Sequence, residues 1–317
     1  MREQIGGVER YARAMARELP RIAPARYRVI EPPGRFAHGA GHAWEQLALP
    51  AAARKSRLIL SPANLAPLAA RGKNVVVIHD AAAVRHPEWY GDAYARWQAV
   101  VLPRLARSAA LVVTPSEWAR GEVAQVLGAD PGHIAVVPGG VEERFRPGTP
   151  SLVAGTYALA LGTDIVRKNL KALEATAATL REQGIELVAA GGQRAYARGE
   201  ELPWLRRIGY VPDTDLPGLY AAAQLVLMPS LYEGFGLPCI EAMACGTPVV
   251  ASDRAALPDT CGNAAVLAAP EDFPQAALEA LERAEELSAA GRERAKNFTW
   301  ERSAGQMDTA LGVLLSS

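Results

Sequence analysis

The stretch PSLYEGFGLPCIEAMACGTPVVAS, residues 229 to 252, decides how this chain folds. It overlaps the end of an apolar run, residues 225 to 229, and it contains a second apolar run at residues 248 to 251; each run predicts a buried strand. Between them, Pro238 suits the first turn of a helix and Gly246 suits the left-handed residue that follows one. The stretch therefore predicts a strand, a glycine-rich loop, a short helix and a second strand.

Two glycines and two glutamates in this stretch indicate a site for a phosphorylated ligand. Gly234 and Gly236 precede the predicted helix, where free N–H groups favour an anion and the missing Cβ atom lets the backbone approach a phosphate. Glu233 lies in the loop and Glu241 in the helix, so we expect them to meet different parts of one ligand. A carboxylate can accept hydrogen bonds from two vicinal hydroxyl groups. The alternative is that both glutamates only favour the positive end of the helix.

Apolar runs alternate with helical patterns along the whole chain, which is typical of parallel sheets covered by helices. We predict an α/β fold of two doubly wound domains, joined at FRPGTPS, residues 145 to 151, where prolines and glycine forbid regular structure. After Pro270 the pattern predicts helix to the end, with a break near Gly291 and a restart around Trp300. The predicted strands are residues 27–31, 57–61, 74–79, 110–114, 134–137, 157–162, 185–190, 206–211, 225–229, 248–251 and 264–268.

Composition excludes several classes of protein. With 317 residues, half of them apolar, the chain can bury a sizeable core. Cys239, Cys245 and Cys261 are too few for a disulfide framework and have no metal-ligand spacing. We find no signal-peptide pattern and no apolar run near the roughly 18 residues that span a bilayer. These observations predict a cytoplasmic protein without zinc.

The two halves of the chain carry opposite charge. Residues 1 to 150 contain 20 Lys and Arg against 13 Asp and Glu, and residues 151 to 317 contain 14 against 21. The basic half could steer an anionic acceptor or a membrane surface, or it could be an ordinary arginine-rich surface. A predicted helix over Val8 to Leu19 has one apolar and one arginine-rich face, which suits either peripheral contact with the inner face of a membrane or a domain surface. No pattern indicates nucleic-acid binding.

The opening stretch resembles the EX7E motif, here Glu233 to Glu241, of the family four retaining glycosyltransferases of the GT-B fold. The resemblance extends to GGVERYA (6–12), VIHD (77–80), VVPGGVEERFRP (136–147), LGTDIVRKN (161–169) and GYVPDTDLPGLYAAA (209–223), so it covers nearly the whole chain. It implies two Rossmann-like domains that face each other across a cleft, an acceptor domain over residues 1–148 and a nucleotide-sugar domain over residues 149–296. NFTWERSAGQ resembles the start of a final segment, residues 297–317, that returns to the first domain.

The resemblance implies a role for each matching residue of the second domain. Glu241 would hold the ribose hydroxyls of the donor, and Glu233 would lie beside the transferred sugar. Arg167 and Lys168 would bind the diphosphate, where fixed cations stabilise the negative charge that grows on the leaving group. Val211, with Pro212, would border the base. The backbone N–H groups around sugar and phosphate would come from Gly234, Phe235, Gly236 and Leu237.

In the first domain the resemblance implies a second set of donor contacts. His79, at the end of a strand, would face the donor sugar as a hydroxyl contact and an electrostatic aid. Gly6 and Gly7, which open a helix, would approach the phosphates. The family has a β-strand before this glycine turn, whereas only MREQI precedes Gly6 here. We therefore expect the first strand to be missing, either because the start of the chain is truncated or because the domain forms without it.

No metal or other cofactor is expected. Asp213 and Asp215 form a DxD pattern, with which other glycosyltransferases hold a divalent cation, but Asp215 reads as a helix N-cap and Asp213 as loop. Ser116 likewise reads as a helix cap, not a nucleophile. The cationic pair Arg167 and Lys168 makes a metal unnecessary. The resemblance favours front-face transfer, in which the departing phosphate oxygen takes the proton of the acceptor hydroxyl.

The predicted activity is retaining transfer of a hexose to a glycan or lipid-linked acceptor. GGVERYA and RKN resemble bacterial mannosyl- and hexosyltransferases of polysaccharide assembly, which makes GDP-mannose the first donor to test and a UDP-sugar the second. A non-catalytic nucleotide-sugar-binding protein and an epimerase of the same fold are the alternatives. A nicotinamide oxidoreductase would need GxGxxG after the first strand of a domain, which LGTDIVRKN lacks.

Overall fold

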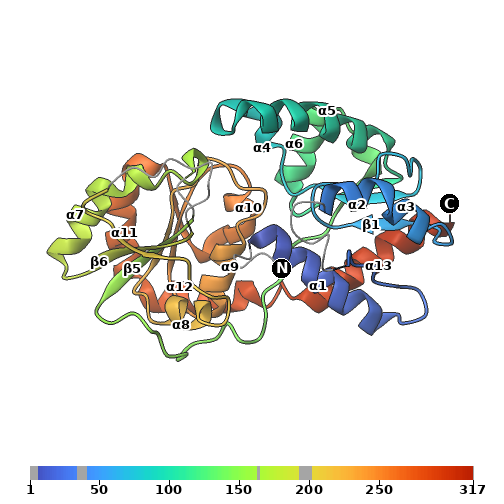
Figure 1. The fold of residues 1–317 in the computed structure, drawn as a ribbon. Helices are drawn as coiled ribbons and strands as arrows, with labels where there is room; N and C mark the ends of the chain where they lie inside the picture. Colours follow the sequence, from blue (N-terminus) through green and yellow to red (C-terminus); the bar gives the residue numbers. More distant parts are fainter. Residues whose placement is uncertain (1–5, 34–40, 163–164, 193–201, 317) are drawn as a thin grey trace. The chain divides into compact units, whose positions relative to one another are not determined.

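The structure is a computed structural model that describes residues 6–33, 41–162, 165–192 and 202–316. The chain forms two compact units, each with one parallel sheet (Figure 1). One unit holds the chain up to Gly139 together with Trp300–Ser317, and the other holds Gly140–Thr299. The division falls just ahead of the linker predicted at residues 145–151. The MREQI segment lies outside the described residues.

The sheet of the first unit has its strands in the order β1-β2-β3-β4, all parallel. Successive residues of β2 face opposite sides, as a strand requires. Val75 and Val77 pack with Tyr11 and Met15 of α1 and with α13, whereas Val76 packs with α5 and α6 on the other side. Both faces are therefore covered. The strands are Ile59–Ser61 (β1), Asn74–Val77 (β2), Leu111–Thr114 (β3) and Ile134–Val136 (β4).

The helices of this unit follow from local signals. Ser116 caps α6, because its hydroxyl accepts from the N–H of Ala119 at 3.0 Å, and Gly128 ends that helix with a left-handed φ of 69°. The α-helices are α1 (Gly7–Ile22), α2 (Gly41–Leu47), α3 (Leu49–Ala52), α4 (Ala82–Arg85), α5 (Asp92–Ser108), α6 (Glu117–Leu127) and α13 (Trp300–Ser316).

The sheet of the second unit has the strand order β10-β9-β8-β5-β6-β7, again all parallel. In β5, Tyr157 and Leu159 pack with α8 and α9, and Ala158 and Ala160 pack with α7 and α11. The strands are Tyr157–Leu161 (β5), Glu186–Ala190 (β6), Arg206–Gly209 (β7), Val226–Met228 (β8), Val249–Ser252 (β9) and Val266–Ala268 (β10). The α-helices are α7 (Glu174–Glu182), α8 (Leu216–Ala221), α9 (Leu237–Ala244), α10 (Leu257–Cys261), α11 (Phe273–Glu282) and α12 (Ala284–Ala295).

Two predicted features are wrong. Residues 27–31 form no strand: Val29 is exposed, and Tyr27 donates its hydroxyl to Asp308 of α13, so the segment lies outside the sheet. The predicted break at Gly291 is also absent, because Gly291 lies inside α12. A Cβ atom there would come within 3.1 Å of the Met243 side chain of α9. This glycine serves close packing of two helices and does not end one.

The segment that leads into the second unit packs tightly on α8. A Cβ atom on Gly218 would lie 1.8 Å from the carbonyl oxygen of Pro150, a distance that no side chain can tolerate. The Tyr157 hydroxyl of β5 also donates to the carbonyl of Leu219 at 2.8 Å. The segment around Pro150, α8 and the first strand of this unit are therefore fixed together. Among the described residues, no helix has both the length and the apolar character needed to cross a bilayer.

Candidate functional site

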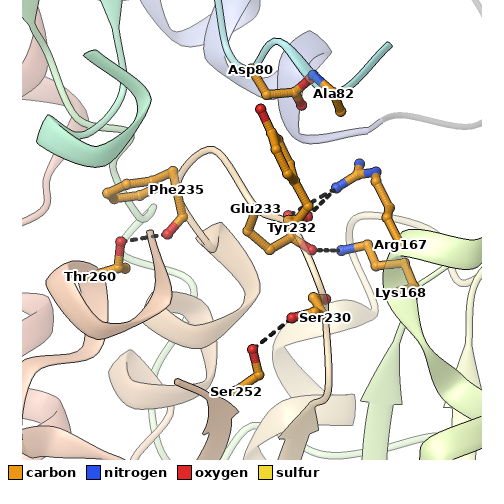
Figure 2. Close-up of polar contacts among 10 residues, drawn as sticks. All are labelled: Asp80, Ala82, Arg167, Lys168, Ser230, Tyr232, Glu233, Phe235, Ser252 and Thr260. Carbon is orange, nitrogen blue, oxygen red and sulfur yellow. Dashed lines mark hydrogen bonds and ion pairs between the residues drawn. The ribbon is translucent and has the colours of Figure 1, made fainter. Parts of the chain in front are cut away.

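A buried cluster of one carboxylate and two cations lies in the second unit, after two neighbouring strands (Figure 2). Glu233 lies in the loop that follows β8, and Arg167 and Lys168 form a short 3₁₀ turn, Val166–Lys168, that follows β5. Because β5 and β8 pair in parallel, their carboxyl ends meet at one edge of the sheet. Lys168 Nζ lies 2.6 Å from Glu233 Oε1, and Arg167 Nη1 lies 3.2 Å from Glu233 Oε2.

Local backbone geometry holds this cluster together. The N–H of Leu231 donates to the carbonyl of Arg167 at 2.8 Å, and the Asn169 side chain donates to the carbonyl of Pro229 at 3.2 Å. Asn169 itself has a left-handed φ of 52°. Gly162 allows the Lys168 stem to pass closely, because a Cβ atom at Gly162 would come within 2.9 Å of it. The two loops are thus tied by backbone as well as by charge.

The charges of the cluster control its protonation. Burial alone would raise the pKa of Glu233, but the positive charges of Lys168 and Arg167 outweigh burial and lower that pKa to about 2. Glu233 is only 7% exposed. The carboxylate is therefore ionised at neutral pH and holds both cations in place. One acid against two bases leaves a net positive charge, which suits an anionic ligand.

The glycine-rich loop after Glu233 has the geometry predicted from the sequence. Gly236 has a φ of 99° and precedes α9, and a Cβ atom on it would lie 2.6 Å from the Leu257 side chain. Thr260 of α10 donates its hydroxyl to the carbonyl of Phe235, so the loop is fixed from both sides (Figure 2). Leu237 is the first residue of α9. Glycine at position 236 thus serves both the left-handed turn and the close packing of the loop on α10.

Glu241, the second glutamate of the motif, has a different hydrogen-bond partner from the cations that contact Glu233. It is 2% exposed on α9, and the hydroxyl of Tyr220 on α8 donates to its Oε2 at 2.8 Å. Both side chains belong to the core between α8, α9 and the sheet. Tyr220 is a residue that the sequence analysis missed, because nothing in its local pattern distinguishes it from an ordinary core aromatic.

His79 of the first unit follows β2 and is half-buried. Its Nε2 lies 2.9 Å from the carbonyl oxygen of Pro62, and a carbonyl can only accept, so this nitrogen carries the hydrogen. The backbone N–H of His79 donates to Asn64 Oδ1 at 2.7 Å, and Tyr11 packs edge-on against the imidazole ring. Burial lowers the pKa of His79, although the Pro62 carbonyl and nearby acids oppose the shift. The imidazole is therefore neutral at pH 7.

The remaining predicted residues occupy ordinary positions. Gly6 is the N-cap of α1, which begins at Gly7, and the Gly6 N–H donates to the Glu9 carboxylate at 3.1 Å. That carboxylate already satisfies one N–H at the helix start. Val211 follows β7 and packs partly buried against the core of the second unit.

The DxD pattern is engaged in a salt bridge. Asp213 accepts from the guanidinium of Arg144 through both its carboxylate and its backbone carbonyl, and Asp215 lies at the N-cap position of α8. Within the described ranges, no three His, Cys, Asp or Glu side chains are grouped so as to hold a metal ion. Arg144 was not singled out in the sequence, because its partner lies 69 residues away.

Comparison with known families gives two matches. A model described as glycosyltransferase family 4 matches residues 5–145, and one described as glycosyl transferases group 1 matches residues 155–286. Among curated proteins, O-antigen chain mannosyltransferase B of Escherichia coli is 32% identical over 267 residues, 76% of this chain and 70% of that protein. The MMP alpha-(1->4)-mannosyltransferase of Mycolicibacterium hassiacum is 29% identical over 240 residues, 69% of this chain and 58% of that protein.

Solved structures share the fold. Sucrose-phosphate synthase from Thermosynechococcus elongatus superposes with a TM-score of 0.73 at 22% identity, covering 98% of this chain and 94% of that one. Anabaena HepE, solved in complex with UDP-glucose, superposes with a TM-score of 0.72 at 18% identity, covering 99% and 98%. Together with the two parallel-sheet units, these neighbours confirm the predicted GT-B fold class.

Proposed function

We propose, from the premise that this chain belongs to the family 4 glycosyltransferases, that it moves a hexose from a nucleotide diphosphate sugar to a hydroxyl of a glycan or glycolipid acceptor, with retention of configuration and without a metal. Membership makes it a glycosyltransferase. The donor, the acceptor, the stereochemistry and the metal independence are the proposed parts.

The observation that carries the proposal is the buried cluster of Arg167, Lys168 and Glu233. As the glycosidic bond breaks, negative charge grows on the leaving diphosphate, and cations already fixed nearby stabilise that charge without reorganisation. Glu233 keeps the two cations oriented before the donor arrives. Retention follows if the acceptor attacks from the side on which the diphosphate leaves, since the departing oxygen then takes the hydroxyl proton.

Mannose is the proposed transferred sugar, and GDP-mannose is its proposed donor. Two similar proteins are named mannosyltransferases, and GGVERYA and RKN favour the same class. A UDP-sugar is the second candidate, since the fold neighbour HepE was solved with UDP-glucose.

The test is calorimetric titration of the purified chain with GDP, UDP, ADP and their hexose conjugates in the presence of EDTA. We expect one nucleotide to bind selectively, and Glu241→Ala to weaken that binding. Lys168→Ala and His79→Ala are expected to lower turnover, the latter with little loss of nucleotide affinity. Equal nucleotide binding by the parent and Glu241→Ala would refute the placement of the ribose.

A further inference from the structure

A row of aromatic side chains begins just before α5, runs along its first turns and continues onto α2. Ring centroids lie 5.7 Å apart for Tyr90 and Tyr94, 6.0 Å for Tyr94 and Trp97, and 5.6 Å for Trp97 and His42. We call these four residues the aromatic row. Tyr94 is 47% and Trp97 38% exposed. Because neighbouring rings of the row lie within about 6 Å of each other, they form one contiguous exposed aromatic surface, the kind of surface to examine for a ligand.

Packing of α5 does not require these rings. The helix buries Ala95, Val101, Leu102 and Leu105 against the rest of the unit, and Tyr94 and Trp97 lie outside that set. Helix α2 is held separately: the Gln46 side chain donates to the carbonyl of Ala66 at 3.0 Å and accepts from the N–H of Leu68 at 2.9 Å. The rings are thus presented by two anchored helices.

A carboxyl group lies at the end of the aromatic row. Glu45 is three residues after His42 on α2, and its Oε2 lies 3.8 Å from His42 Nδ1, too far for a hydrogen bond. Its side chain is only 19% exposed, and within the described parts of the chain no hydrogen bond to its carboxyl group is present. Burial raises its pKa to about 7. The Glu45 oxygens are not among the buried side-chain atoms that lack a hydrogen-bond partner, so they remain open to the hydroxyl of a ligand.

We propose that Trp97, Tyr94 and Glu45 form a binding surface for a pyranose ring of a saccharide acceptor. The inference rests on the proposed function, because it names the acceptor's chemical class. A pyranose has one apolar face of C–H groups, which packs on an aromatic ring, and a rim of hydroxyls, which donate to a carboxylate. This surface offers both features side by side.

The local charge favours a neutral sugar over an anionic lipid. From Tyr90 to Trp97 the only charged residues are Asp92 and Arg96, which cancel, and Glu45 adds an acid. Arg104 and Arg107, further along α5, donate to the carbonyls of Val100 and Pro103 at 2.7 and 3.0 Å. An anionic membrane surface selects clusters of four or more cations. The aromatic row lacks such a cluster, although its unit is basic as a whole.

The test is titration of the full chain, without donor, with disaccharides of mannose, glucose, galactose and N-acetylglucosamine, followed by NMR. We expect at least one disaccharide to shift the Trp97 indole signal. Trp97→Ala is expected to weaken that binding by about tenfold or more, and Trp97→Phe to retain most of it. Val100→Ala, at a site on the same helix that is also exposed, is the control and should bind like the parent. Thermal melting checks that each variant is folded.

Three results would overturn the inference. One is that no disaccharide shifts the indole, or that Trp97→Ala binds as well as the parent. Another is sedimentation of the parent, but not of Trp97→Ala, with phosphatidylglycerol vesicles when no disaccharide binds. The third is a change of oligomeric state in Trp97→Ala, which would make the row an interface between copies. Failure of the proposed function would instead appear as a parent chain that binds no nucleotide. Nucleotide binding is measured separately from this disaccharide titration, so the two failures can be told apart.

Discussion

Glu233 and Glu45 are both largely buried carboxyl groups, and their surroundings shift their pKa values in opposite directions. Glu233 has two cations within 3.2 Å, which hold its pKa near 2, whereas in the described part of the chain no cation lies that close to Glu45, and burial raises its pKa to about 7. The pH dependence of stability should therefore have opposite sign at the two sites.

Glu233→Gln tests the first sign. The folded-state pKa lies below the usual 4.5, so the carboxylate contributes stability above pH 4.5 that is lost as the pH falls towards 2. We expect the variant to be less stable than the parent at pH 7, and the deficit to shrink by about 3 kcal/mol at low pH. Urea unfolding of the parent and the variant at pH 7 and at low pH measures this deficit in the free energy of unfolding. An unchanged deficit would contradict the shifted pKa.

Glu45→Gln tests the second sign. Here the folded-state pKa lies above 4.5, so the protonated group contributes stability below pH 4.5 that is lost as the pH rises through about 7. Between pH 4.5 and pH 8, the free energy of unfolding of the neutral variant should rise relative to that of the parent by at most about 3 kcal/mol. The same unfolding experiment serves, with Glu233→Gln as the contrasting variant. If Glu45→Gln instead gained stability relative to the parent as the pH is lowered, Glu45 would be ionised in the folded parent.

Tyr220→Phe tests whether Tyr220 positions Glu241. Removing the hydroxyl deletes its 2.8 Å bond to the carboxylate and leaves the packing intact. We expect about fivefold weaker nucleotide binding, equivalent to about 1 kcal/mol. Tyr157→Phe is the matched control: it removes a buried hydroxyl of the same unit that donates to a backbone carbonyl. Equal effects of the two changes on affinity would indicate a merely structural role.

At the scale of elements, most strands were predicted well because they are short apolar runs covered on both faces; the edge strand β7, Arg206–Gly209, is mostly exposed and is the exception. The run at residues 27–31 was misread, since an apolar run does not reveal whether a partner strand lies beside it. Gly291 was misread for a similar reason: the sequence shows a glycine but not that Met243 of α9 packs against it. Helix caps at Ser116 and Gly246 were predicted correctly, because both depend on local geometry.

Gly218→Ala tests the packing of α8. The added Cβ atom would clash with the backbone of Pro150, which cannot move aside as a flexible side chain can. We expect a loss of about 3 kcal/mol or more in the free energy of unfolding. Gly305→Ala in α13 is the control, because a Cβ atom there meets nothing within 4 Å and alanine favours helix by up to about 1 kcal/mol. A tolerated Gly218→Ala would mean that the segment at Pro150 packs more loosely.

At the scale of the whole molecule, the chain crosses between its units twice, and its last helix belongs to the first unit. Trp300, Ala304, Met307 and Leu311 of α13 are buried in the core that α1 and the β2 strand share. The first unit therefore depends on residues that follow the whole second unit in the sequence. Its charge also differs from that of the second: 19 Lys and Arg against 13 Asp and Glu, compared with 15 against 21.

Ending the chain after Thr299 tests this dependence. The truncation removes four buried apolar side chains from the first unit and none of the core residues of the second. We expect backbone amides of β2 to lose protection from hydrogen exchange, while those of β8 keep theirs. Removing only the last two residues is the control and should leave both patterns unchanged. Equal protection of β2 in the two shortened proteins would show that α13 is dispensable.

The sequence by itself determined what depends on neighbours along the chain: two parallel α/β sheets, the glycine loop before α9, several helix ends, and the residues of the EX7E and RKN motifs. Only the tertiary structure decided which side chains meet. Glu233 binds cations more than 60 residues away, Glu241 pairs with Tyr220, Asp213 with Arg144, and His42 beside Glu45 packs against Trp97 of another helix. The reason is physical: hydrophobic periodicity and capping act over a few residues, whereas burial and charge pairing arise from packing between distant segments.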